Sequence, residues 1–228
     1  MDSLTNIIQT IAVYALPVLF AITAHEAAHG FMAQKLGDNT AAMLGRVTLN
    51  PVKHIDPIGT IAIPLALVLM ALITQGQVGL LFGYAKPVPV RVDRLKNPRS
   101  DMIWVALAGP LSNLAQALIW GVLYYLLLGM GVTEPFFTAM CQGGVTVNAM
   151  LFAFNLFPLP PLDGGRVLVG LLPPGPALAL ARLEPYGFFI VMGLAISGVI
   201  GAIWMSPLMN LTFAVIKTIL SPLQALLT

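Results

Sequence analysis

The stretch His25-Glu26-Ala27-Ala28-His29 stands near the end of a long apolar segment. An α-helix turns once per 3.6 residues, so the imidazoles of His25 and His29 share a face and can both reach one Zn²⁺ at about 2.0–2.1 Å. Glu26 directly follows the first imidazole and can act as a base on a water at that metal. Because charge is costly in hydrocarbon, these residues indicate a functional site. We therefore expect a membrane helix that carries two ligands and a base.

Composition indicates that the whole chain is an integral membrane protein. Of its 228 residues, 58% are hydrophobic and 9% are charged, and the mean hydropathy is +0.89; soluble domains carry about a quarter charged residues. The net charge of +2 is too small to indicate nucleic-acid binding. A single cysteine, Cys141, excludes an intrachain disulfide. Residues 1–10 lack Lys and Arg, so we expect the first helix to be retained and residues 1–228 to form one membrane-embedded domain.

Four apolar runs are long enough to cross the hydrocarbon layer, which takes about 20 residues. They cover residues 7–34, 102–130, 136–158 and 186–205. Ser206-Pro207 and Ser221-Pro222 each resemble a helix start, which divides the C-terminal part of 186–228 into a helix and a short remainder. This tail is either a fifth span with a kink or an interfacial helix. The sequence predicts an all-α polytopic membrane protein of five to six membrane segments.

Residues 57–82 are apolar but are interrupted by proline, glycine and glutamine. The loops before and after them hold eight of the 11 basic residues: Lys35, Arg46, Lys53, Lys86, Arg91, Arg94, Lys96 and Arg99. A complete crossing would place these two loops on opposite sides of the membrane, against the positive-inside tendency. We therefore expect a re-entrant segment with both loops in the cytoplasm and the N-terminus outside.

Two short stretches, residues 45–49 and 84–90, have the character of β-strands. Pro87 and Pro89 remove N–H donors from one side of the second stretch and leave the other side free. We expect small β elements here, close to the histidine pair.

A catalytic zinc usually has three protein ligands, so the histidine pair requires one more. Asp163 is the outstanding candidate among the nine acidic residues. Three prolines within residues 158–161 end the preceding helix, and Gly164-Gly165 permits a sharp turn after the carboxylate. The basic-residue pattern puts the end of the 136–158 helix on the same side as the histidines. We predict one Zn²⁺ per chain, with Asp163 as its third ligand.

Three motifs together resemble the site-2 protease family of intramembrane zinc metalloproteases. They are the His25–His29 motif, Gly109-Pro110-Leu111-Ser112-Asn113, and the run from Asn155 to Gly165, which span the core of the chain from residue 25 to 165. The resemblance implies that His25, His29 and Asp163 bind zinc and that Glu26 is the catalytic base. It also implies that Asn113 and Asn155 bind substrate backbone or steady the oxyanion. We expect a compact member, without the inserted PDZ domain or C-terminal CBS domain of larger ones.

Several of these residues also have simpler explanations. Asp163 alone could cap backbone N–H groups at a turn, and Asn113 could bond across helices beside Gly109. Asn155 could satisfy carbonyls freed by the prolines that follow it. Three weaker candidates for the site are His54 and, in the extended stretch, Tyr84 and Lys86.

The sequence favours a zinc-dependent endopeptidase that cleaves transmembrane segments of other proteins, as in regulated intramembrane proteolysis. A metal-ion transporter or channel with the same His/Glu/Asp cluster is the main alternative, and a non-catalytic scaffold is a third. Transport would need polar residues leading to the opposite face, where the spans are almost wholly apolar. Expected partners are a transmembrane protein substrate and the lipid bilayer, with homo-oligomerisation left open. The compact form is typical of a prokaryotic inner membrane, with the site toward the cytoplasm.

Overall fold

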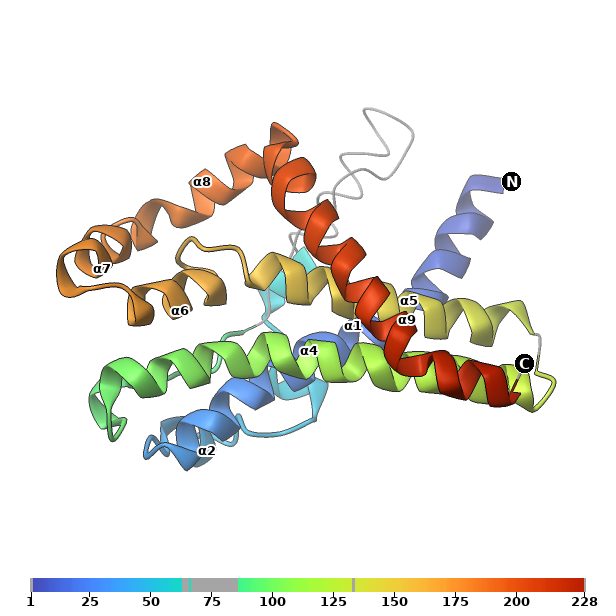
Figure 1. The fold of residues 1–228 in the computed structure, drawn as a ribbon, viewed down its shortest axis with the longest axis horizontal. Helices are drawn as coiled ribbons and strands as arrows, with labels where there is room; N and C mark the ends of the chain where they lie inside the picture. The colour runs from blue at the N-terminus through green and yellow to red at the C-terminus, as the bar shows by residue number, and fades with distance from the viewer. Residues whose placement is uncertain (1, 63–65, 67–85, 133, 228) are drawn as a thin grey trace.

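The computed structural model describes residues 2–62, 66, 86–132 and 134–227, and its regular elements are helices (Figure 1). The four long ones are α1 (Asp2–Lys35), α4 (Pro98–Gly129), α5 (Pro135–Asn155) and α9 (Ser206–Leu227). Shorter α-helices are α2 (Thr40–Met43), α6 (Asp163–Leu171), α7 (Pro174–Ala181) and α8 (Glu184–Ile196). Single turns of 3₁₀- or π-helix are η1 (Pro51–Lys53), η2 (Pro57–Ala62), η3 (Val92–Arg94) and η4 (Gly201–Met205).

Within the part of the chain that the structure describes, four helical segments are long and apolar enough to cross a membrane. They are Ile8–Lys35, Pro98–Gly129, Pro135–Asn155 and Gly201–Leu227. The α7–α8 pair, bent by 69°, would make a fifth as one broken span. This confirms an all-α protein with several membrane-length helices. Most of the predicted re-entrant segment 57–82 lies outside the described residues, so the expected total of five to six segments stays a prediction.

Helices α1, α4 and α5 pack against one another, and α9 crosses α4 and α5 (Figure 1). Small residues bring these helices close together. A Cβ on Gly144 of α5 would approach the Trp120 ring of α4 to 2.3 Å, and one on Gly121 of α4 would approach Leu220 of α9 to 2.4 Å. Lipid is as apolar as the helix surfaces, so the hydrophobic effect does not drive these helices together as it does in a soluble core. Van der Waals contacts between closely packed helices stabilise the bundle instead.

The helix break near the C-terminus differs from the prediction. The expected span 186–205 is interrupted, because α8 ends at Ile196 and Gly198 adopts a φ of 75°, a conformation that ends helices and favours glycine. The α-helix α9 begins at Ser206, where the Ser206-Pro207 signal predicts a start, but the π-turn η4 runs directly into it, so the helical run begins earlier. The wider π-turn accommodates a proline that has no N–H to donate. Pro222 lies inside α9 and starts no new helix.

The predicted β elements are not confirmed. Residues 45–49 form a turn and bends, residues 86–91 lack regular secondary structure, and no residue that the structure describes belongs to a strand. The backbone N–H of Lys86 donates to the carbonyl of His54 at 2.9 Å, and the N–H of Val88 donates to Oε2 of Glu26 at 2.8 Å. This extended segment is therefore bonded to a loop and a side chain. Tyr84 lies outside the described residues.

Asp38 anchors the same segment to the end of α1. Its buried carboxylate accepts hydrogen bonds from the backbone N–H of Thr40 at 2.9 Å, from the Thr40 hydroxyl, and from the backbone N–H of Arg91 at 2.6 Å. Burial alone would raise the pKa of this carboxyl, but the hydrogen bonds from Thr40 and Arg91 outweigh burial and hold the pKa below its ordinary value. Asp38 therefore fixes the path of residues 86–91 beside α1.

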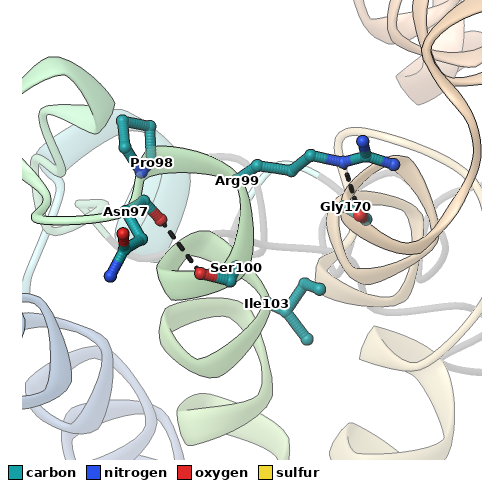
Figure 2. Close-up of a pocket in the computed structure, with 6 residues that line it drawn as sticks. All are labelled: Asn97, Pro98, Arg99, Ser100, Ile103 and Gly170. Atoms are coloured by element: carbon teal, nitrogen blue, oxygen red, sulfur yellow. Dashed lines mark hydrogen bonds between the residues drawn. The ribbon is translucent and has the colours of Figure 1, made fainter.

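A surface pocket of about 400 Å³ lies where α4 meets the end of α6. Figure 2 shows its lining residues, Asn97, Pro98, Arg99, Ser100, Ile103 and Gly170. Nε of Arg99 donates to the Gly170 carbonyl at 2.9 Å, and its guanidinium also bonds the carbonyl of Leu172. Arg99 thus caps the C-terminal end of α6 and holds it against α4. None of the predicted metal ligands lines this pocket.

Candidate metal centre

Three ligand atoms from two distant parts of the chain converge at one point. Nε2 of His25 and Nε2 of His29 lie 3.1 Å apart, and they are 3.3 Å and 3.4 Å from Oδ2 of Asp163. Four ligands placed tetrahedrally at 2.0–2.1 Å from a zinc ion would be separated by about 3.3–3.4 Å. The triangle of side chains therefore has the dimensions of one face of a zinc coordination sphere, with its fourth corner left for another ligand.

Hydrogen bonds at Nδ1 determine which ring nitrogen of each imidazole carries the proton. Nδ1 of His29 lies 2.7 Å from the carbonyl oxygen of Val105, which can only accept, so this nitrogen carries the proton. Nδ1 of His25 donates to Oδ1 of Asn113 at 2.7 Å in the same way. In the neutral rings both Nε2 atoms then present lone pairs toward Asp163, whose buried Oδ2 has no hydrogen-bond donor among the described residues. Three mutually repelling electron-rich atoms fit a bound cation.

Helix α4 provides both the hydrogen bonds and the space for the histidines. Gly109 lies directly against the rings: a Cβ there would come within 2.3 Å of Nε2 of His29 and 2.6 Å of Cε1 of His25. Val105 and Asn113 flank it one turn away on either side. The Gly109–Asn113 motif therefore supports the metal ligands that α1 carries.

Asp163 is positioned by a tight turn between α5 and α6. A Cβ on Gly164 would lie 2.1 Å from the carbonyl oxygen of Leu156, and one on Gly165 would lie 2.1 Å from the backbone nitrogen of Pro160. Only glycine permits the two backbones to approach so closely. Asp163 is the first residue of α6, where the positive end of the helix dipole favours a carboxylate.

Glu26 lies beside the ligands on α1, partly exposed, and its Oε2 is held by the N–H of Val88. A carboxylate in this place can accept and return a proton at a metal-bound substrate. The hydrogen bond from Val88 fixes the direction of the Glu26 carboxylate. It also places the extended segment 86–91 next to Glu26.

The other predicted site residues have the following positions. Asn113 is fully buried, and besides its bond to His25 its Nδ2 donates to the Ala21 carbonyl at 3.1 Å and to Oδ1 of Asn148 at 3.0 Å. Asn155, the last residue of α5, donates to the Leu151 carbonyl at 3.0 Å.

The two weaker described candidates lie together beside the extended segment. His54 is buried with Nε2 at 2.9 Å from the Thr48 carbonyl and is not among the three converging ligands. Lys86 is exposed, and its backbone N–H bonds His54. The hydrogen bond between these two residues thus connects the stretch after α2 that contains His54 to the extended segment 86–91.

Sequence reasoning missed three supporting groups. The carbonyl of Val105 and the N–H of Val88 belong to the backbone, which leaves no residue-type signal. Asn148 did offer a signal, because a polar amide within an apolar span is costly unless it is paired.

Together, the membrane-length helices and the two-histidine, one-carboxylate cluster with an adjacent glutamate define a membrane metallohydrolase. Comparison with curated proteins identifies relatives named as zinc metalloproteases. YwhC of Bacillus subtilis is 39% identical over 198 residues, covering 85% of this chain and 84% of YwhC. Rip2 of Mycolicibacterium smegmatis is 31% identical over 186 residues, covering 78% of this chain and 64% of Rip2. Rip2 of Mycobacterium tuberculosis is 31% identical over 183 residues with the same coverage.

The chain belongs to the site-2 protease family and is a zinc metalloprotease. The match to the Rip2 proteins spans slightly under two thirds of their length. No protein-family profile matches the chain, and no solved structure matches it.

Proposed function

We propose that this protein is an intramembrane endopeptidase that cleaves transmembrane segments of other proteins, with His25, His29 and Asp163 holding one zinc ion. The observation that carries the proposal is the place of the ligands. Both histidines and Glu26 lie on a helix long and apolar enough to cross a membrane, so the site is within reach of substrate segments in the bilayer. Residues 1–228 act as one membrane-embedded domain in this proposal.

In the mechanism, bound zinc supplies Lewis-acid chemistry that polarises a peptide carbonyl and makes a water more acidic. The Glu26 carboxylate accepts a proton from the attacking water and then donates it to the amine of the leaving half. The Val88 N–H keeps Oε2 of Glu26 in a fixed direction during both transfers. The Nδ1 bonds to Asn113 and to the Val105 carbonyl fix the tautomer of both imidazoles and leave each Nε2 for the metal.

A transmembrane substrate must unwind locally, because its carbonyls are hidden in helical hydrogen bonds. We propose residues 86–90 as the segment that receives the unwound strand. The N–H groups of Lys86 and Val88 are already engaged, and Pro87 and Pro89 have none. The carbonyls of Pro87 and Pro89 are therefore the proposed acceptors for substrate N–H groups, and Asn113, whose amide is fully bonded, supports His25 in this scheme.

The proposed location is a bacterial inner membrane, with the site toward the cytoplasm. The relatives are bacterial proteins. Eight of the 11 basic residues lie in the two loops that flank residues 57–82, and basic loops tend to face the cytoplasm. Reporter tags at residues 55 and 95 test the topology, and reporting from opposite faces of the membrane would contradict it.

The test compares wild type with Glu26→Gln and with Glu134→Gln, a control at an exposed position just before α5. Bound zinc and cleavage of a panel of transmembrane peptides are measured for each. We expect all three to bind one zinc, and Glu26→Gln to lose cleavage by about 10²-fold or more because a neutral amide does not take the proton. Full cleavage by Glu26→Gln would contradict the mechanism. Zinc binding without hydrolysis by any form would favour transport or a scaffold.

A further inference from the structure

A buried chain of amide groups connects α5 to a metal ligand on α1. Oδ1 of Asn148 accepts from Nδ2 of Asn113 at 3.0 Å, and Oδ1 of Asn113 accepts from Nδ1 of His25 at 2.7 Å. Both asparagines are 0% exposed. Three helices thus meet in one hydrogen-bonded line that ends at the metal centre.

Each amide in this line has its orientation fixed by groups that can only accept. Nδ2 of Asn148 donates to the Gly144 carbonyl at 2.9 Å, so Oδ1 of Asn148 must face Asn113. Nδ2 of Asn113 in turn has two acceptors, the Ala21 carbonyl at 3.1 Å and Oδ1 of Asn148. A flipped Asn113 amide would turn its oxygen toward two oxygens. Its Oδ1 is therefore held toward His25, where it requires a proton on Nδ1.

We infer that Asn148 is a positioning residue of the metal centre, which acts through Asn113 to fix the ring orientation and the tautomer of His25. The tautomer with its proton on Nδ1 leaves the lone pair of Nε2 for the metal. This inference rests on the proposed zinc centre and adds to it a residue on α5, a helix that contributes no ligand. Outer-shell partners of this kind commonly change metal affinity by about 10- to 100-fold.

A purely structural role for Asn148, as a polar contact between α4 and α5, predicts different behaviour. Removing an interhelical hydrogen bond lowers the stability of the bundle but leaves the affinity of an intact site unchanged. Zinc affinity, measured independently of activity, separates the two roles.

The experiment measures the zinc dissociation constant of the full chain by competition with a chelator, and the unfolding temperature of the metal-free form. Asn148→Leu keeps the approximate volume and removes both polar atoms. Asn148→Ser keeps a hydroxyl for the Gly144 carbonyl but is too short to reach Asn113. The matched control is Thr212→Val on α9, a buried residue whose hydroxyl, among the described residues, donates within its own helix to the Leu208 carbonyl.

We expect both Asn148 variants to raise the dissociation constant about 10- to 100-fold and Thr212→Val to leave it unchanged. In an Asn113→Ala background, Asn148→Leu should add little further loss, because its effect passes through Asn113. Wild-type affinity in an Asn148 variant that folds, or fully additive losses in the double variant, would overturn the inference. A wild-type protein that binds no zinc would overturn the metal centre itself, so the two failures are distinguishable.

Discussion

At the scale of single residues, Gly109 decides whether the two imidazoles fit beside α4. A Cβ at this position would lie 2.3 Å from Nε2 of His29 and 2.5 Å from its Cε1, distances that require the ring or the helix to move. Because the ring is held by the Val105 carbonyl on the same helix, movement would break that bond or shift the ligand. We expect Gly109→Ala to weaken zinc binding about 10- to 100-fold, measured by chelator competition.

Gly193→Ala on α8 is the control for Gly109→Ala. Beyond the backbone of its own helix, a Cβ on Gly193 would meet no atom of the described residues within 4 Å, so this substitution should leave zinc affinity unchanged. Equal affinities for wild type and Gly109→Ala would show that the site accommodates the methyl group without moving its ligands.

The residues of the candidate site were predictable to different degrees. The helical spacing of His25 and His29 and the position of Asp163 after the proline-rich turn were enough to predict the cluster that the structure brings together. For Asn113 the sequence left two roles open, a substrate contact or a hydrogen bond across helices, and its bond to His25 depends on the packed arrangement of α1 and α4. Side-chain chemistry can be predicted from sequence, whereas partners across a helix interface depend on packing.

At the scale of elements, Asp38 connects the end of α1 to the extended segment that holds Glu26. We expect Asp38→Asn to cost about 1–3 kcal/mol, because a neutral amide replaces a carboxylate that accepts bonds from Thr40 and from the Arg91 N–H. The segment 86–91 should also loosen, since the Arg91 N–H bonds Asp38 just beyond α1, as the Val88 N–H bonds Glu26 on α1. Thermal unfolding of the metal-free proteins in detergent measures the loss.

The pH dependence of this loss follows from the lowered pKa of Asp38. A carboxyl with a lowered folded-state pKa stabilises the fold above its unfolded pKa of about 3.9, and this stabilisation is lost as the pH falls through the folded value. The difference in unfolding temperature between wild type and Asp38→Asn should therefore be constant from about pH 5 to 8 and shrink below about pH 4. A difference that grew toward acid pH would contradict this account of Asp38.

Helix boundaries show where sequence patterns reach their limit. Proline stands in the first turn of α5 and of α8, where its missing N–H costs no helical hydrogen bond. The Ser206-Pro207 signal matches the start of α9 but not the start of the helical run, because the π-turn η4 precedes Ser206 without a break. Gly198 carried the better signal, since a left-handed glycine ends a helix wherever packing permits. Local patterns therefore predict that elements exist more reliably than they predict where elements end.

At the scale of the whole molecule, α4 organises the site although it contributes no ligand. It packs against α1, α5, α6 and α9, and so it contacts both elements that carry ligands (Figure 1). Its Val105 carbonyl and Asn113 side chain orient the histidines, and Arg99 near its start holds the end of α6. The helix acts as the common support against which α1 and α6 bring their ligands together.

This arrangement predicts that zinc stabilises the whole fold, because the ion would join α1 to α6 across α4. A ligand that binds only the folded state at 1,000 times its dissociation constant adds about 4 kcal/mol of stability. We expect a chelator to lower the unfolding temperature of wild type and of Glu26→Gln equally, since Glu26 is not a ligand. Asp163→Asn should show a much smaller shift, because it lacks the charged ligand from α6. Scanning calorimetry or thermofluor in detergent, with and without zinc, makes the comparison. Equal shifts in Asp163→Asn and wild type would mean that the ion binds elsewhere, and a lost shift in Glu26→Gln would make Glu26 a ligand.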